Sequence, residues 1–353
     1  MEDISKYSEP GEDRRGLFSL DRTAGITLFL GIIVLLGLTL FSWNSTRTAT
    51  YERNLAAFQT LSKDSKQALT HRIDSYKQSL DSGAALFAAS DQVTIEDWKT
   101  FVSILNIDET LPGINGIGYI EPVLRSQERE YLADMAARGV DYIEPVSTNL
   151  EAVGLDIAFE TNRRSAAYHA RDTGNATITK RIFLVQEKTK RAGFLLLRPI
   201  YQPGRSVTSV AQRRAAFRGW IYAPFVAARF MEDLTASQGK NFNITVHDGV
   251  SADPSRSIFA SDGMSGESRS AQYSVTETLP IMGQQWTVTW YSTAEFESSV
   301  GTQEPMFVLV GGLALMLAFS TLVIFYARRE AYVKDEVRSK TQILVDKEKE
   351  IVN

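Results

Sequence analysis

The sequence predicts an α+β fold in which a long stalk helix precedes two small α/β units, flanked by two transmembrane helices and a C-terminal helix. Three observations predict this organisation. Two uncharged apolar segments of helical length lie near the two ends of the chain. A long polar segment without proline follows the first of them. The remainder alternates between short strand and helix patterns, which is typical of small mixed domains.

The composition excludes several classes of protein. The 353 residues include 38 Lys and Arg against 42 Asp and Glu, 44% hydrophobic residues and no cysteine. This hydrophobic content is sufficient for a packed core, so the chain is not disordered. Without cysteine, disulfide scaffolds, thiolate zinc sites and cysteine nucleophiles are excluded. The net charge of −4 gives no reason to expect nucleic acid as a partner.

The two apolar segments have the length of membrane spans. Residues 26–43 would reach about 27 Å as a helix and residues 306–326 about 31 Å. A cleaved signal peptide is the alternative for the first segment. The acidic N-terminal tail and the lack of a small-residue cleavage site after Trp43 argue against it. We therefore expect two transmembrane helices, with the lipid bilayer as a partner.

The charges that flank the spans predict their orientation. Three arginines within residues 14–22 precede the first span, and Arg328 and Arg329 follow the second. The positive-inside rule then places both termini in the cytoplasm. The N-terminal tail, residues 1–25, is cytoplasmic in this interpretation, and residues 44–305 form one extracytoplasmic domain.

The stalk helix is expected at about residues 48–90, continuing from the first span. Apolar residues such as Leu69, Ile73, Tyr76 and Leu80 recur at spacings of three and four, and no proline interrupts them. This stripe either forms the seam of a homodimer or packs the helix against its own domain. The two interpretations are compatible, and we expect a homodimer.

The first α/β unit covers about residues 91–201. Its expected elements are a helix from Thr94 to about Ile104, a strand at Ile114–Val123, helices at Gln127–Arg138 and Asn162–Arg171, and strands at Ile178–Gln186 and Gly193–Tyr201. The last two strands should pair antiparallel across a basic turn.

A polar, arginine-rich connection leads to the second unit, at about residues 215–300. There we expect a strand at Arg218–Phe225, a helix at Val226–Leu234, and strands that begin near Asn243, Ser257, Tyr273 and Trp286.

Residues 327–353 form the C-terminal helix. Val337, Leu344 and Ile351 recur at intervals of seven among charged residues, which is the pattern of a short helix that pairs with a second copy. A solvated helix next to the membrane is the alternative. We expect it to lead to an output domain that this chain does not contain.

No catalytic motif is recognisable in the sequence. It lacks a P-loop, a nucleophile elbow and a zinc-protease motif. His71, His169 and His247 lie between the spans and have no metal-binding spacing. We therefore expect no metal, no cofactor and no catalytic residues here, and whether the whole protein is an enzyme depends on its output domain.

Five stretches in the extracytoplasmic segment resemble a known family. In chain order between Phe101 and Phe225 they read LPGINGIGYIEPV, LDIAFETNRRSAAYHARDTGNATIT, LVQE, GFLLLRPIY and RRAAFRGWIYAPF. Together they resemble a CHASE domain, the extracellular sensor of cyclases and histidine kinases. No single stretch is diagnostic, but the ordered set between two spans is fairly specific.

The resemblance implies a distal and a proximal PAS-like subdomain, at residues 91–201 and 215–300. It also implies a dimer and a ligand pocket in the distal subdomain. The best-known relatives are plant cytokinin receptors, so a purine-like, adenine- or cytokinin-like ligand is one expectation. The last stretch resembles bacterial members attached to diguanylate cyclases or histidine kinases, which implies a bacterial inner membrane with the sensor in the periplasm.

The resemblance also implies site residues. Asp156 resembles an aspartate that accepts hydrogen bonds from the ligand, Thr173 is the threonine of the helix-ending Thr-Gly, and Ile178 matches a pocket leucine. The alternative for Asp156 is an ion pair with Arg163 or Arg164, or a turn cap.

Three further residues, Tyr119, Phe194 and Leu196, are expected to supply apolar pocket walls. The alternative for these three, and for Ile178, is a place in the core. His169 and Thr173 also have ordinary structural interpretations, as a helix residue and a helix-end residue.

The function hypothesis is a membrane sensor that binds a small extracytoplasmic ligand and signals across the membrane to a histidine kinase or diguanylate cyclase. One alternative is a module that only dimerises or binds a periplasmic protein. Another is a double-PAS sensor of a different class, such as a chemoreceptor domain, with an amino-acid site, several cations near the pocket and no role for Asp156.

Overall fold

The computed structural model describes residues 22–123, 126–127, 129–131, 133, 143–185, 191–236, 241–261 and 270–352. Most of the expected N-terminal tail and most of the expected helix Gln127–Arg138 lie outside these ranges. The chain divides into two compact units. One comprises Asn54–Val300, and the other joins the two flanking segments, Met1–Arg53 and Gly301–Asn353.

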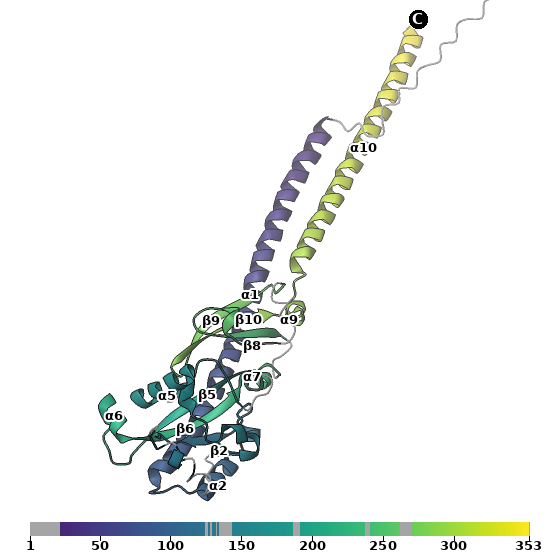
Figure 1. Cartoon of the computed structure of the whole chain (residues 1–353). Coiled ribbons are helices and arrows are strands. Elements are labelled where there is room, and N and C mark those ends of the chain that lie inside the picture. The colour runs from purple at the N-terminus through teal and green to yellow at the C-terminus, as the bar shows by residue number, and fades with distance from the viewer. Residues whose placement is uncertain are drawn as a thin grey trace, which may run out of the picture. The chain divides into compact units, whose positions relative to one another are not determined.

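The flanking unit contains the two apolar helices. Helix α1 (Arg22–Ala89) is continuous over 68 residues, from the first apolar segment through the expected stalk, and α10 (Glu304–Val352) carries the second segment (Figure 1). Each helix contains an 18-residue apolar segment with a mean hydropathy of 2.5, and only 6% of that segment is buried. Both helices are therefore long and apolar enough to cross a membrane, as the sequence predicts.

Two glycines allow the apolar parts of α1 and α10 to approach closely. A Cβ on Gly31 would come within 2.3 Å of the Phe319 ring, and one on Gly312 within 2.2 Å of the Thr39 side chain. Neither position has room for a larger side chain. The adjacent Gly311 has no heavy atom within 4 Å of its Cβ position, so only one glycine of the pair lies at the contact.

The unit Asn54–Val300 contains two antiparallel sheets. The first has the order β2-β1-β6-β5-β3, with β4 also paired to β5, and the second has the order β8-β7-β10-β9. The strands of the first sheet are β1 (Ile117–Ile120), β2 (Ile143–Glu144), β3 (Thr177–Ile178), β4 (Ile182–Phe183), β5 (Ala192–Tyr201) and β6 (Phe217–Val226). Those of the second are β7 (Phe242–Asp248), β8 (Ser257–Ala260), β9 (Ser274–Ile281) and β10 (Gln284–Ser292).

Helices and short 3-10 turns connect the strands. The helices are α2 (Ile95–Leu105), α3 (Ile107–Thr110), α5 (Thr161–Thr173), α6 (Val210–Ala216), α7 (Ala227–Ala236) and α9 (Ala294–Ser299). The 3-10 turns are η1 (Val146–Thr148), η2 (Leu150–Ala152), η3 (Ile157–Phe159) and η4 (Pro254–Arg256). Thr94 caps α2 as expected, with Asp97 completing a capping box. The mixture of helices with antiparallel sheets confirms the α+β class.

The structure differs from the sequence prediction in the connection between the subdomains. Strand β6, expected to open the proximal unit at residues 215–300, pairs with β5 and β1 in the first sheet. The first subdomain therefore extends past residue 201 to Val226. The polar connection also contains a helix, α6, whose capping box joins Ser209 and Gln212. This Ser-x-x-Gln spacing is a helix-start signal that is readable in the sequence.

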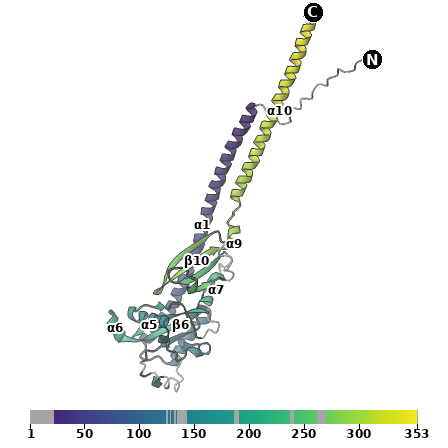
Figure 2. The same cartoon turned by 45° about the horizontal axis from the view of Figure 1, so that its top comes forward.

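The stalk part of α1 packs against the domain to which it belongs. Phe58, Leu69, Tyr76 and Leu80 are at most 2% exposed and share one hydrophobic core with residues of both sheets. Figure 2 shows this helix passing along the sheets. The apolar stripe of the stalk is thus accounted for by packing within the chain, and nothing in it tests the expected homodimer.

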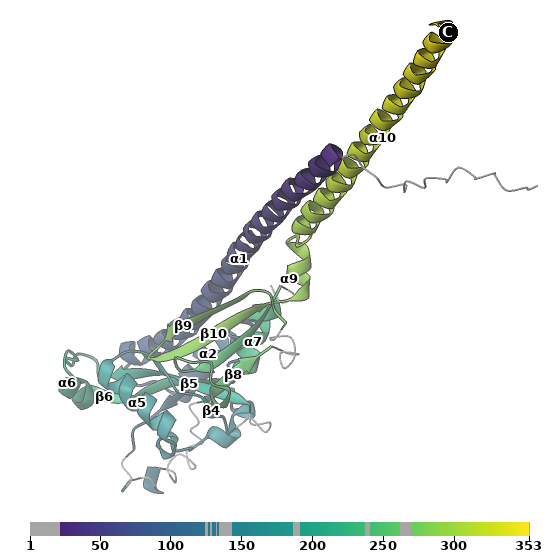
Figure 3. The same ribbon diagram turned by 90° about the horizontal axis from the view of Figure 1, so that it is seen from above.

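The opposite face of the first sheet is covered by α5 (Figure 3). A second, smaller core joins Ala166, Ala167 and Ala170 of this helix to Leu195 and Leu197 of β5. The first sheet therefore has two covered faces, one toward α1 and one toward α5. Small alanine side chains on α5 leave space over this second face.

Candidate functional site

A cavity of about 690 Å³ lies on the α5 side of the first sheet. Strands β1, β5 and β6, helix α5 and the segment 152–158 all contribute to its lining. Small-molecule sites occupy roughly 300–1,000 Å³, so the cavity has the size of a ligand pocket.

Part of the cavity wall is apolar and aromatic. Leu195, Trp220 and Tyr222 line it, and all three are at most 7% exposed. The Trp220 indole donates a hydrogen bond to the carbonyl of Ala167, with 2.9 Å between Nε1 and the oxygen. Phe217 packs edge-on against this indole at 4.4 Å between ring centroids. The hydrogen bond and the ring contact fix the indole, so an apolar or aromatic ligand would meet a preformed surface.

Arg163 is the most deeply buried charged group at the cavity. It lies in the first turn of α5, where the Glu160 carboxylate accepts its backbone N–H at 2.9 Å. The residue is only 3% exposed. Its Nη2 donates to the carbonyl of Phe183 at 2.8 Å, and its Cζ lies 5.4 Å from the centroid of the Phe159 ring. Its Nε is buried and has no hydrogen-bond partner in the described part of the chain.

Burial shapes the electrostatics of the cavity. It lowers the pKa of the Arg163 guanidinium, an effect that the Glu160 carboxylate partly opposes. It also raises the pKa of the Tyr222 phenol, against the opposing charge of Arg163. Arginine nevertheless remains protonated in proteins. The cavity therefore contains a positive charge that has lost much of its hydration.

Two other arginines of α5 line the same cavity. Arg164 Nη1 donates to the carbonyl of Ala158 at 2.8 Å. Arg171 donates from Nε to Asp172 at 2.8 Å and lies over the Tyr168 ring at 4.7 Å. Positions 164, 168 and 171 share a helix face because residues three and four apart are neighbours. The arrangement provides the several cations near a pocket that the alternative chemoreceptor-type class predicts.

The structure brings two of the residues named from the family resemblance to this cavity. Asp156 is exposed at the cavity, and its Oδ1 accepts the N–H of Ala158 at 2.8 Å, which caps η3. Within the described residues it forms no ion pair with Arg163 or Arg164. The Tyr119 hydroxyl donates to the carbonyl of Arg218 at 2.8 Å. Its ring stacks on Phe87 of α1 at 4.7 Å between ring centroids, so the tyrosine borders the cavity while its ring packs on the other face of the sheet.

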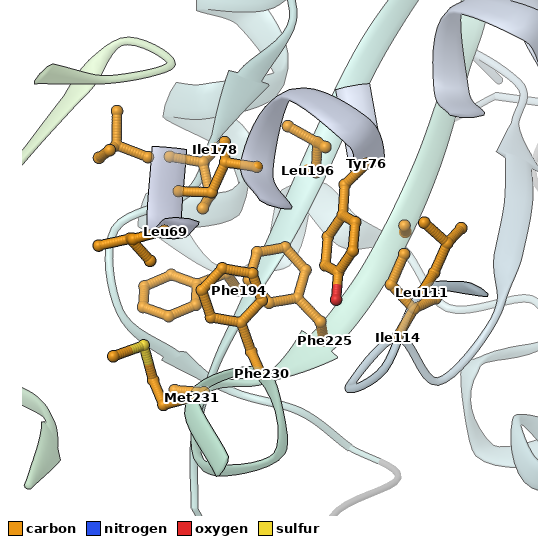
Figure 4. Close-up of a cluster of buried hydrophobic side chains, with 14 of the residues drawn as sticks. Leu69, Tyr76, Leu111, Ile114, Ile178, Phe194, Leu196, Phe225, Phe230 and Met231 are labelled. Carbon is orange, nitrogen blue, oxygen red and sulfur yellow. The ribbon is translucent and has the colours of Figure 1, made fainter. Parts of the chain in front are cut away.

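The other four do not line this cavity. Ile178, Phe194 and Leu196 are at most 2% exposed and belong to the core that includes α1, where they lie near Leu69 and Tyr76 (Figure 4). Successive residues of a strand point to opposite faces. Because Leu195 faces the cavity, Phe194 and Leu196 face away from it.

Thr173 is also outside the cavity lining. It is the last residue of α5, and its Oγ1 donates to the carbonyl of His169 at 2.7 Å. Gly174 follows as the left-handed C-cap, with φ of 79°. Its interactions are those of a helix-end residue.

Sequence reasoning missed the residues that define the cavity. Trp220 and Tyr222 of β6 point to the cavity face, and the residues between them point to the other face. Because both faces are covered, the strand is a continuous apolar run, and its sequence does not show which residues face the cavity. In the sequence, Arg163 suggested only an ion-pair partner for Asp156. An arginine followed at helical spacing by Ala166, Ala167 and Ala170 is the available signal, because small side chains leave room beside a charged one.

Comparison with known proteins gives one family match. Residues 91–259 match the model of the CHASE domain. No curated protein matches the chain.

Several solved structures have a distant similarity. One is the ligand-binding domain of the Pseudomonas aeruginosa PAO1 amino acid chemoreceptor PctC in complex with GABA, with 10% identity, a TM-score of 0.37, and 64% of this chain and 94% of that chain covered. A second is methyl-accepting chemotaxis protein X, with 12% identity, a TM-score of 0.35, and 67% and 98% covered. The third is the periplasmic sensory domain of the Campylobacter jejuni chemoreceptor Tlp1, with 9% identity, a TM-score of 0.39, and 71% and 96% covered.

The family match contains all five stretches from which the resemblance was inferred. It includes the whole first sheet and the cavity, and it reaches into the second sheet. The described part of the chain also contains two helices long and apolar enough to cross a membrane, as the sequence predicts for a membrane-bound sensor. The resemblance to a CHASE domain is confirmed by this match over residues 91–259.

Proposed function

We propose that this chain is the sensing part of a bacterial inner-membrane receptor and that a small extracytoplasmic ligand occupies the cavity beneath α5. The observation that supports this proposal is a cavity of ligand size, with an aromatic wall and several polar groups, within a CHASE domain. The receptor is a homodimer with both termini in the cytoplasm. Its output is a histidine kinase or diguanylate cyclase joined beyond α10.

Asp156 orients the ligand in this proposal. Its Oδ1 caps η3, but a carboxylate has lone pairs for further donors, and the side chain is open to the cavity. A ligand with two N–H groups, such as an adenine-type compound, would be held by it while its ring lies against Trp220.

Transmission starts at the first sheet. The Ile178 N–H donates to the carbonyl of Met282 at 3.0 Å, and the Arg181 N–H donates to Asp248 at 3.0 Å. These bonds join β3 and the start of β4 to the second sheet, and Phe183 of β4 accepts from Arg163 at the cavity. A ligand that binds one arrangement of these segments more tightly than another shifts their populations, and equal affinity for both would transmit nothing.

The test is a thermal-shift screen of the full chain in lipid nanodiscs with adenine-type compounds, followed by calorimetry. Ala158→Trp should fill the cavity and abolish the shift, whereas Ala211→Trp, on the exposed part of α6, should preserve it. Asp156→Ala should weaken binding about 10-fold or more, because it removes a charge-assisted hydrogen bond.

The outcomes separate the proposal from its rivals. Binding that survives Ala158→Trp would place the ligand elsewhere. Binding that needs the open cavity but survives Asp156→Ala would retain the sensor and remove Asp156 from recognition. If no compound in a broad metabolite screen shifts the melting temperature, the domain acts by dimerisation or by binding a periplasmic protein.

A further inference from the structure

The Arg163 guanidinium has more donors than its surroundings satisfy. Only 3% of the residue is exposed to solvent. Its hydrogen-bond acceptor is a neutral backbone carbonyl, that of Phe183, and Nε has no partner among the described residues. Glu160 contributes a favourable charge but directs both its oxygens to backbone N–H groups of α5. Buried charges are normally paired, since an unpaired one loses hydration without compensation.

The other arginines at the cavity already have partners. Arg164 donates to the Ala158 carbonyl and Arg171 to the Asp172 carboxylate. Arg163 is therefore the cation at the cavity that has a buried donor without an acceptor among the described residues. It lies next to the apolar wall formed by Leu195, Trp220 and Tyr222. A single incompletely bonded guanidinium favours a ligand with one negative charge.

We propose that the sensed ligand is a carboxylic acid with an apolar or aromatic body, and that its carboxylate pairs with Arg163. This inference rests on the proposed small-molecule function of the cavity. A planar carboxylate accepts two hydrogen bonds from one guanidinium, and such pairs are short and directional. Nε supplies a free donor for it, while the body of the ligand replaces water against Trp220. A phosphate would carry a second charge, for which the described lining offers no unpaired cation.

The experiment compares each acid with its neutral amide. The full chain in nanodiscs is titrated with indole-3-acetate and indole-3-acetamide, and with benzoate and benzamide, by thermal shift and calorimetry. The acid of a pair should bind at least 10-fold more tightly than its amide. Arg163→Met should abolish that difference, and Arg205→Met is the matched control that preserves it, because Arg205 is exposed and does not line the cavity.

The melting temperature of the ligand-free Arg163→Met variant tests the role of Arg163 without depending on the choice of probe compound. A buried charge that awaits a ligand is costly without it, so this variant should melt at the same temperature as the original chain or higher. A lower melting temperature would assign Arg163 a structural role and overturn the proposal. Equal affinity of acids and amides, or no binding by either acid, would also overturn it.

These results are distinct from failure of the proposed function. If adenine-type compounds or the amides bind and Ala158→Trp abolishes that binding, the cavity remains a sensor site while the carboxylate assignment falls.

Discussion

His247 is a buried imidazole in the second sheet. It lies on β7 opposite Thr287 of β10, is 9% exposed, and its Nδ1 has no hydrogen-bond partner in the described residues. Burial lowers its pKa, and the negative charge of Asp253 partly opposes this effect. The folded chain therefore keeps the imidazole neutral at pH values where the unfolded chain already protonates it.

This residue makes the stability of the domain depend on pH. Its contribution is complete above the unfolded pKa of about 6.5 and is lost as the pH falls toward the lower folded pKa, since the unfolded state then binds the proton first. His247→Gln should flatten the decline of the melting temperature between pH 7 and pH 5. The exposed His71→Gln serves as the control, and an unchanged slope in the His247 variant would contradict this account.

The chemistry of single residues was only partly visible in the sequence. The resemblance led to Asp156, which lies at the cavity, and to Tyr119, which borders the cavity while its ring packs against Phe87 on the other face of the sheet. It also pointed to Phe194 and Leu196, one position away from the cavity-facing Leu195. A continuous apolar run does not reveal which of its alternate residues face a pocket, because that depends on what covers each side of the sheet.

At the scale of elements, the contact between α1 and α10 depends on one glycine of an adjacent pair. Gly312 faces Thr39 with no room for a Cβ, whereas Gly311 has open space. Gly312→Val should destabilise the packing of the two helices by about 1–3 kcal/mol, as expected for an overpacked contact.

Gly311→Val is the matched control, because it makes the same substitution in the same helix without the contact. Thermal unfolding in detergent should separate the two variants. Equal melting temperatures would mean that the close approach of these helices contributes nothing to stability.

The long elements could be predicted, and the boundaries between subdomains could not. The spans, the stalk helix and the strands of the second sheet follow from hydrophobic periodicity, which is a local property. Strand β6 was assigned to the wrong unit because its pairing with β5 is set by tertiary contacts between nine residues of each strand. Helix α6 was missed because it has only seven residues and most of them are exposed, which leaves only its cap as a signal.

At the scale of the whole molecule, the orientation in the membrane is a prediction that the sequence makes easy to test. The 353 residues contain no cysteine, so one introduced cysteine is the only thiol among them. Ser45→Cys and Gly301→Cys should react with a membrane-impermeant maleimide in intact spheroplasts. Ser339→Cys should react only after permeabilisation, because positive flanks remain in the cytoplasm. The reverse labelling pattern would invert the proposed topology.

Strand β5 faces the cavity on one side and the stalk on the other, and this has a consequence for how sensor domains of this kind diversify. Leu195 borders the cavity, while its neighbours Phe194 and Leu196 are part of the packing against the stalk. Selection for a new signal can act on alternate positions of one strand and leave the intervening positions under a separate constraint. A lineage can thus exchange the compound it detects while inheriting the same mechanical connection to its stalk.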